Sequence, residues 1–144
     1  MKIRDILFRG KKKYQDLWVE GGFYYLKYPA IITCRDTLNS IAVEEETVGM
    51  YTTLSDRNGR KIFEGDFCRF YGDEGYADYE VFFTNSASDC QAVGFYVRQL
   101  DTGATDTFDA FFASNCEVIG NIHDNPELLK CAATDTNVGS KDKV

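Results

Sequence analysis

The chain has 144 residues, 44% of them hydrophobic and 15% aromatic, so it is long enough for one domain with a real core and too apolar for a disordered chain. Its formal net charge of −7 argues against general binding to nucleic acid through phosphate neutralisation. Phe and Tyr dominate the aromatic residues and there are only 2 Pro, a composition that favours strands.

The charge is unevenly distributed along the chain. Residues 1–35 hold eight Lys or Arg against three Asp or Glu, a net charge of +5, which leaves −12 for residues 36–144. The first quarter can therefore face an acidic partner, whereas the rest of the surface repels one.

The first third of the chain predicts short strands separated by turn signals. Strands are expected over residues 3–10, 14–20, 23–28 and 31–34. Gly10 is expected to end the first strand before a charged turn at Lys11-Lys12-Lys13, and Gly21-Gly22 to end the second. Residues 36–47 combine helical spacing of apolar side chains with many β-branched residues, and we predict a strand plus a loop there.

The rest of the chain continues in the same way. Further strands are predicted over residues 48–54, 67–71, 79–83, 95–100 and 116–122. Asn58-Gly59 predicts a tight turn, and Gly65-Asp66 predicts a corner at which the Asp side chain bonds the neighbouring backbone. Residues 107–112 fit either a strand or a short amphipathic turn.

A short helix is expected to close the domain. Asn125 has the character of an N-cap residue, and Pro126 suits the first helical position. The small, polar residues 131–144 predict a flexible tail, so a single domain is expected over residues 1–130.

Three segments resemble the YopX family of phage and prophage proteins. The first is Leu7-Phe8-Arg9 followed by Trp18. The second runs from Val48 to Asp66 and is similar to the family's central block QYTGLKDKNGKEIYEGD. The third, residues 117–129, is similar to the family's EVIGNIYENPELL. Their order and spacing span almost the whole predicted domain.

The resemblance implies a mainly β fold, with small barrel-like sheets that include an SH3-like element, and an origin in a phage or mobile element. It implies no reaction, because the family has no assigned activity. Three residues depart from the family pattern: Met50 stands where Gln is usual, Thr53 where Gly is usual, and His123 where an aromatic residue is usual. At Thr53 we therefore do not expect a backbone conformation reserved for glycine.

Residues that could carry chemistry are scattered along the sequence. His123 is the only histidine, and the five cysteines are widely spaced without a C-x-x-C pair, so we predict no metal site, no cofactor and no Cys–His catalytic pair. Four acids surround Gly75, namely Asp73, Glu74, Asp78 and Glu80, and we interpret them as solvated charge. No catalytic residue is predicted, and the chain is not expected to be an enzyme.

The one surface that suggests binding is basic and aromatic. It consists of Arg9, Lys11, Lys12, Lys13, Tyr14 and Trp18. Small barrels bind single-stranded nucleic acid by stacking bases on aromatic rings beside a positive groove. The alternative is that Trp18 belongs to the core and the lysines form a solvated turn, and the acidic total favours this alternative.

The sequence thus predicts an accessory protein that acts through protein–protein contacts or self-assembly as a homo-oligomer. A nucleic-acid-binding module and an acidic imitation of DNA are the other open functions. The first residues lack the apolar run of a signal peptide and no stretch is long enough to span a membrane, so we expect the cytoplasm of a bacterial host cell and no membrane partner.

Overall fold

The computed structural model describes residues 6–24, 31–33, 40–84 and 93–129. The chain divides into two compact units, residues 1–53 and 54–144, and the boundary falls inside strand β5 (Gly49–Ser55). Each unit is described by itself. The single domain expected over residues 1–130 stays a prediction, and the expected tail lies outside the described residues.

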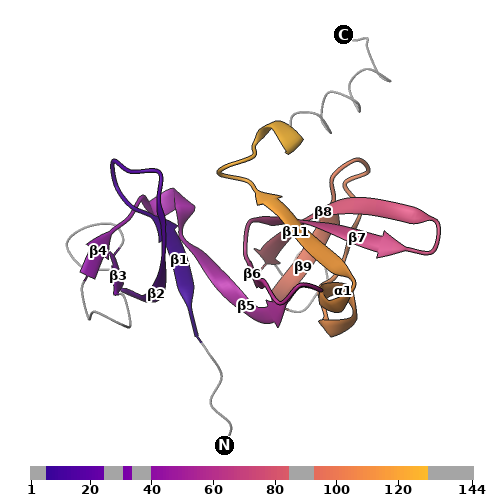
Figure 1. Cartoon of the computed structure of the whole chain (residues 1–144), viewed down its shortest axis with the longest axis horizontal. Coiled ribbons are helices and arrows are strands. Elements are labelled where there is room, and N and C mark those ends of the chain that lie inside the picture. The colour runs from indigo at the N-terminus through magenta and orange to yellow at the C-terminus, as the bar shows by residue number, and fades with distance from the viewer. Residues whose placement is uncertain (1–5, 25–30, 34–39, 85–92, 130–144) are drawn as a thin grey trace, which may run out of the picture. The chain divides into compact units, whose positions relative to one another are not determined.

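The first unit is an antiparallel sheet with the strand order β4-β3-β2-β1-β5 (Figure 1). Its first four strands are β1 (Phe8–Lys11), β2 (Trp18–Tyr24), β3 (Ile31–Thr33) and β4 (Ser40–Ala42). The 3-10 helix η1 (Glu45–Thr47) joins β4 to β5. A strand within residues 36–47 is thus confirmed, and part of the expected loop is helical.

Glycines lie inside the strands of the first unit instead of ending them. Gly10 is buried within β1, where an added Cβ would lie 3.0 Å from Cγ2 of Val43. The missing side chain therefore makes room for Val43, on which Phe8 and Val19 pack. Strand β2 likewise continues through Gly21-Gly22, because it pairs with β1 on one side and β3 on the other. The predicted ends at Gly10 and Gly21 were wrong for this reason.

Thr53 also departs from expectation. Its backbone has φ 75°, in the left-handed region that favours glycine. The family's usual Gly would adopt this conformation without strain, whereas a β-branched side chain cannot. The sequence prediction that Thr53 avoids a glycine-type conformation was therefore wrong.

The second unit is built on a five-stranded antiparallel sheet of order β10-β9-β8-β7-β11 (Figure 1). Its elements are β6 (Lys61–Phe63), β7 (Asp66–Gly72), β8 (Gly75–Thr84), β9 (Gly94–Gln99), β10 (Thr105–Thr107), α1 (Ala110–Ser114) and β11 (Cys116–Asn121). Residues 107–112 thus supply both predicted alternatives, the end of a strand and the start of a helix. Asp109 begins the helix by accepting a hydrogen bond from the Phe112 amide at 2.9 Å.

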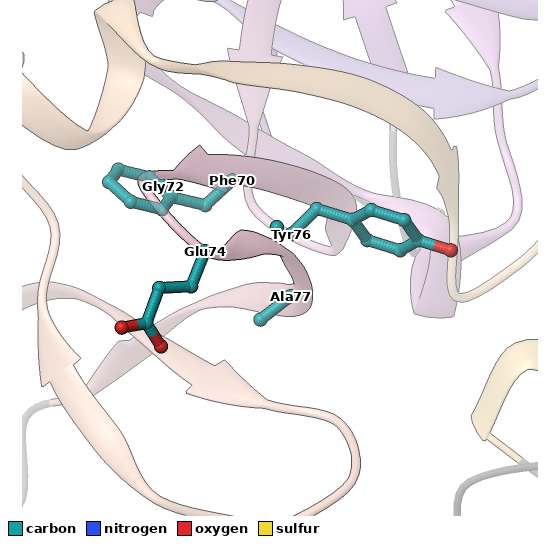
Figure 2. A pocket seen from close by; sticks show the side chains of 6 residues that line it. Phe70, Gly72, Glu74, Tyr76 and Ala77 are labelled. Atoms are coloured by element: carbon teal, nitrogen blue, oxygen red, sulfur yellow. The ribbon is translucent and has the colours of Figure 1, made fainter.

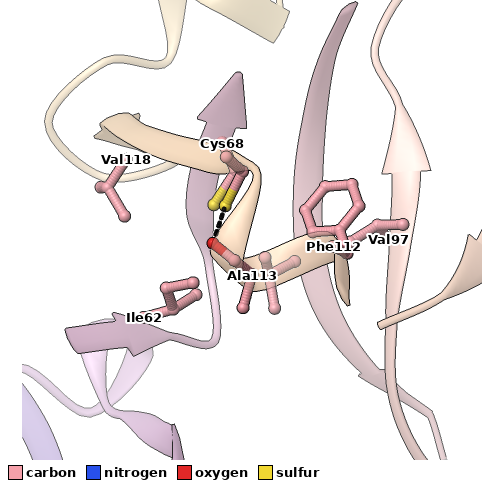
Figure 3. Packing of buried hydrophobic residues seen from close by; sticks show 8 residues of the cluster. Ile62, Cys68, Val97, Phe112, Ala113 and Val118 are labelled. Atoms are coloured by element: carbon pink, nitrogen blue, oxygen red, sulfur yellow. Dashed lines mark hydrogen bonds between the residues drawn. The ribbon is translucent and has the colours of Figure 1, made fainter. Parts of the chain in front are cut away.

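The core of the second unit lies between one face of this sheet, helix α1 and strand β6 (Figure 3). Its buried side chains include Cys68, Val81 and Val97 from three neighbouring strands and Phe112 from the helix. Because successive side chains of a strand point to opposite sides, the other face of the sheet carries a different set of residues. We call that second set the outer face.

The mainly β, antiparallel fold is confirmed, and the short C-terminal helix has its first residues at Glu127–Leu129, at the end of the described range. Among the described strands, neither sheet closes on itself. The barrel-like shape and the SH3-like element therefore remain predictions.

Candidate functional site

The predicted basic and aromatic residues lie on the β1–β2 hairpin. Lys11 pairs with Trp18 and Arg9 with Glu20, so these four side chains share one face of the hairpin. The Arg9 guanidinium carbon lies 4.6 Å from the centre of the Trp18 ring, and Lys11 Nζ lies 5.5 Å from it. Trp18 is only half-buried, and the residues that pack on Val43 lie on the opposite face. The ring therefore lies beside two cations, of which Arg9 is buried, and does not fill that core.

The tip of the hairpin exposes an aromatic ring. Tyr14 is 95% exposed and has φ 66°, an uncommon conformation for a residue with a side chain. The turn is closed by a hydrogen bond of 2.9 Å from the Lys12 amide to the Leu17 carbonyl, and Lys11 pairs with Asp16. Lys12 and Lys13 precede the exposed ring in the chain.

The outer face of the second unit carries a set of paired charges and rings that sequence reasoning missed. We restrict the name to the members that are at least partly exposed, together with Arg57, which lies between β5 and β6 and contacts Tyr71; Phe67 and Tyr96 share this face of the sheet but are buried. The members are Arg57, Arg69, Tyr71, Tyr76, Asp78, Glu80, Phe82, Arg98 and Glu117. The strand register places Arg69 opposite Asp78, Tyr71 opposite Tyr76, and Glu80 opposite Arg98. Arg69 binds Asp78 through two hydrogen bonds of 2.8 and 3.1 Å, a bidentate pair that fixes the guanidinium plane.

Three guanidinium groups stack on aromatic rings of this face. The distances from the guanidinium carbon to the ring centre are 4.1 Å for Arg69 over Tyr76, 4.7 Å for Arg57 over Tyr71, and 4.2 Å for Arg98 over Phe82. Stacking and ion pairing together hold long side chains in one conformation, which lowers the entropy lost when a partner binds. Contacts within the chain thus hold these side chains of the outer face in place.

These contacts and burial shift the pKa values of three side chains on the outer face. The hydrogen bond to Asp78 raises the pKa of Arg69, and the hydrogen bond from the Tyr71 hydroxyl to Glu117, 3.0 Å long, raises the pKa of Tyr71. Burial raises the pKa of Glu80, although its pairing with Arg98 acts in the opposite direction. Arg69 therefore stays charged at neutral pH, and Tyr71 keeps its proton.

The four acids around Gly75 do not gather into a catalytic pair. Asp78 and Glu80 bind different arginines. Glu74 lines a shallow hollow of about 230 Å³ at the β7–β8 turn, and Figure 2 shows its carboxylate and the Tyr76 ring pointing in different directions. The arrangement on this hairpin is one of paired charges, and the interpretation of all four as solvated charge was wrong for Asp78 and Glu80.

The Asn58-Gly59 turn is confirmed, and a buried carboxylate that the sequence did not single out holds it. Gly59 has φ 84°, and Asp56 Oδ1 accepts hydrogen bonds of 2.9 Å from the amides of Asn58 and Arg60. Asp56 Oδ2 accepts the Val118 amide of β11, also at 2.9 Å. A turn that is local in sequence is thereby joined to a distant strand edge. The only sign of this contact in the sequence is an Asp two residues before Asn58-Gly59.

The Gly65-Asp66 corner is confirmed as well. Gly65 has φ 93°, and the buried Asp66 accepts the Phe63 amide at 2.8 Å. Backbone hydrogen bonds join Gly65 to Val81 and to Ile122. The corner therefore connects β6, β8 and the end of β11.

Asn125 acts differently from the predicted N-cap. Its side-chain oxygen accepts the Asn121 amide at 3.1 Å, while its backbone carbonyl accepts the Leu128 amide. Asn121 in turn accepts the amides of His123 and Asp124. Pro126 precedes the first helical residue, Glu127. The side chain of Asn125 thus closes the β11 loop, and only its backbone serves the helix.

Cys68 and Cys116 are buried beside each other in the core, and Cys116 also bonds the Ala113 carbonyl at 3.5 Å (Figure 3). The hydrogen bond between the two thiols and their burial raise the pKa of Cys68, so the thiol form is favoured. Cys34, Cys90 and Cys131 lie outside the described residues. The side chain of His123, the only histidine of the sequence, lies near Gly65.

Within residues 6–24, 31–33, 40–84 and 93–129 there is no group of three His, Cys, Asp or Glu side chains placed to hold a metal ion. No helix among those residues is long and apolar enough to cross a membrane.

Comparison with protein families gave a match. The family model described as YopX protein matches residues 7–130, which is most of the chain and includes all three sequence segments noted above. A search of curated proteins found no match.

Proposed function

This chain belongs to the YopX family, and we propose that it is a phage- or prophage-derived accessory protein that works in the bacterial cytoplasm by binding another protein and catalyses no reaction. The observation that carries the proposal is the outer face of the second unit. Five of its nine members are Tyr or Arg, and these residue types are enriched among those that supply most of the energy of protein interfaces.

The state of these side chains supports binding rather than catalysis. Tyr76 is 61% exposed and Tyr71 is 37% exposed, so both rings remain available to a partner. The charges beside them are already paired, as for Arg69 with Asp78, and a partner need not leave an unpaired charge buried at the interface. The same features suit self-association, in which two copies present the same face to each other.

The residues of the family's sequence blocks also support the proposal, because they have structural roles. The side chains of Asp56, Asp66 and Asn121 accept hydrogen bonds from backbone amides. Such residues explain a shared sequence pattern by the needs of the fold, without an active site. The proposed activity therefore lies with exposed groups outside these turns.

The experiment compares three chains: the wild type, Tyr76→Ala and the control Val93→Ala. Val93 is 67% exposed and lies outside the outer face. Each chain is immobilised and exposed to an extract of phage-carrying cells, the retained protein is purified, and its affinity for each chain is then measured directly. Sedimentation of the chain alone tests self-association.

Tyr76→Ala is expected to weaken the interaction at least about tenfold, or about 1.4 kcal/mol, because the variant loses an interface ring and the group on which Arg69 stacks. Val93→Ala is expected to bind like the wild type. Equal affinity of all three chains for the purified partner would refute binding through the outer face.

A second function is favoured by one observation, the strained and fully exposed Tyr14 between Lys13 and the rest of the hairpin turn. An exposed ring beside lysines can stack on an unpaired base. Under this second proposal the hairpin binds single-stranded nucleic acid. The acidic imitation of DNA receives no support from the outer face, where Asp78, Glu80 and Glu117 all have partners within the chain.

The hairpin is tested with a fluorescent single-stranded oligonucleotide of mixed sequence at several salt concentrations. Replacing Lys11, Lys12 and Lys13 by Ala should reduce the slope of log affinity against log salt by roughly 0.7 for each lysine that meets a phosphate. Tyr14→Ala should weaken binding without changing this slope. A wild-type chain that does not bind at low salt would exclude this second function.

A further inference from the structure

A small cavity of about 160 Å³ opens beside the core of the second unit, between β10, helix α1 and the inner face of the sheet. Four aromatic rings line it, those of Phe70, Tyr79, Phe111 and Phe112. Its volume lies below the roughly 300–1,000 Å³ of sites that hold drug-sized molecules, so it suits a single side chain or a short amine. We call it the aromatic pocket.

The rings form one connected group. Phe112 stacks on Phe70 with ring centres 5.1 Å apart, and it meets Tyr79 edge to face at 5.2 Å. Phe111 lies 6.1 Å from Phe70 and is 69% exposed, so it stands at the mouth of the pocket. A wall of this kind presents electron-rich ring faces to whatever enters.

Two carboxylates complete the lining. Asp106 pairs with Val97 across β10 and β9, and because paired residues share a face, Asp106 points to the inner side of the sheet. Asp109 lies at the start of α1, where only its Oδ1 is bonded to the Phe112 amide. Among the described residues that line the pocket there is no cation to balance them. Asp106 and Asp101 also contribute to the raised pKa of Tyr79, after burial, which indicates a negative field at the pocket wall.

We propose that the aromatic pocket binds an alkylammonium group, the head of a lysine side chain presented by a partner protein that reaches from the outer face past the edge strand β10. The rings attract the cation through their negative faces and enclose its aliphatic stem, and Asp106 and Asp109 attract its charge. The identity of the cation's owner rests on the proposed function, but the preference of the pocket for an ammonium group does not.

The test uses the full chain and a small probe, so that no partner is needed. The probe is n-butylammonium, and n-butanol serves as the uncharged control of similar size; each is titrated while the NMR signals of the four rings are followed. Butylammonium should bind in the millimolar range and shift these signals, at least about fivefold more tightly than butanol.

Variants separate charge from shape. Asp106→Asn combined with Asp109→Asn keeps both oxygen acceptors, so the hydrogen bonds to Thr107 and Phe112 can persist, and it should weaken butylammonium about tenfold while leaving butanol unchanged. Asp73→Asn changes the net charge by the same sign at a turn that does not line the pocket, and should leave both affinities unchanged. Phe111→Ala should weaken butylammonium about threefold.

Equal binding of butanol and butylammonium, or an undiminished affinity in the double Asp variant, would overturn the proposal. Self-association of the Asp106→Asn chain with no change in its affinity for butylammonium would also overturn the proposal. Asp106 would then serve to protect the edge strand β10 from pairing with another chain. Tyr76→Ala separates this inference from the proposed function: it should weaken partner binding at least about tenfold and leave butylammonium binding intact.

Discussion

The two units of the chain differ in what stabilises each of them internally. In the first unit, the described part of the core is a cluster around Val43, and Gly10 leaves the space that Val43 fills. In the second unit a larger cluster spans the sheet, α1 and β6, and the buried carboxylates of Asp56 and Asp66 bind the turns around it. The comparison teaches that the segment of residues 48–66 supplies two buried carboxylates, Asp56 and Asp66, which fix the backbone around the larger core.

The largest expected effect comes from removing a buried carboxylate in the second unit. Asp56→Ala leaves the amides of Asn58, Arg60 and Val118 without their acceptor and should lower the free energy of unfolding by about 3 kcal/mol. Urea denaturation measures this loss. Asp73→Ala, at an exposed turn, should change it by less than about 0.5 kcal/mol, and a similar loss in both variants would contradict the role given to Asp56.

Next in size is the crowding between Gly120 and the loop that follows it. A Cβ at Gly120 would collide with the side chain of Asn125, so Gly120→Ala should lower stability by about 2 kcal/mol. Asn125→Ala alone should cost about 1 kcal/mol, because the Asn121 amide loses its acceptor. The double variant should be more stable than the sum of the two losses implies. Strict additivity of the losses would show that the two residues do not meet.

A smaller effect of opposite sign is expected at the end of the first unit. Thr53→Gly removes a side chain from a left-handed conformation and restores the family's usual residue, so it should raise stability by about 1 kcal/mol after the entropy of the unfolded glycine is included. Trp18, the only tryptophan and a member of the first unit, reports the transition by fluorescence. A loss of stability in Thr53→Gly would mean that this backbone position carries no strain.

The smallest expected effect depends on pH. Burial raises the folded-state pKa of Glu80 above its usual 4.5, so folding favours the protonated carboxyl, and this stabilisation is lost as the pH rises through the raised pKa. Glu80→Gln lacks this titration, and its stability relative to the wild type should therefore improve with rising pH, by less than about 1 kcal/mol for a group paired with Arg98 near the surface. A difference that is constant from pH 3 to pH 7 would exclude a raised pKa.

Local patterns were enough to predict much of the second unit. Asn58-Gly59 and Gly65-Asp66 require particular backbone angles, and such requirements are visible in a few neighbouring residues. Strand positions followed from alternating side chains between turn signals. Gly10 shows the limit of this reasoning, because its place inside a strand depends on Val43, which is distant in sequence.

The candidate sites depend on pairings that no local pattern contains. Alternation predicts which residues of one strand share a face, but the stacking of Arg69 on Tyr76 requires the register of β7 against β8. Asp56 reaches an amide 62 residues away, and Asn125 turns from the helix it precedes toward β11. The basic and aromatic residues that the sequence singled out lie on one hairpin, where Tyr14 is exposed and Arg9 is buried, whereas the pocket between α1 and the sheet could be found only from the folded chain.

The amides that the buried carboxylates accept offer the most direct test of this account. Hydrogen exchange of the intact chain, followed by NMR, measures the protection of the Phe63 and Val118 amides, which bond Asp66 and Asp56. Both should exchange only when the second unit unfolds, as slowly as the amides in the middle of β7 and β8. Exchange at the rate of an exposed loop would contradict the claim that these carboxylates hold the fold together.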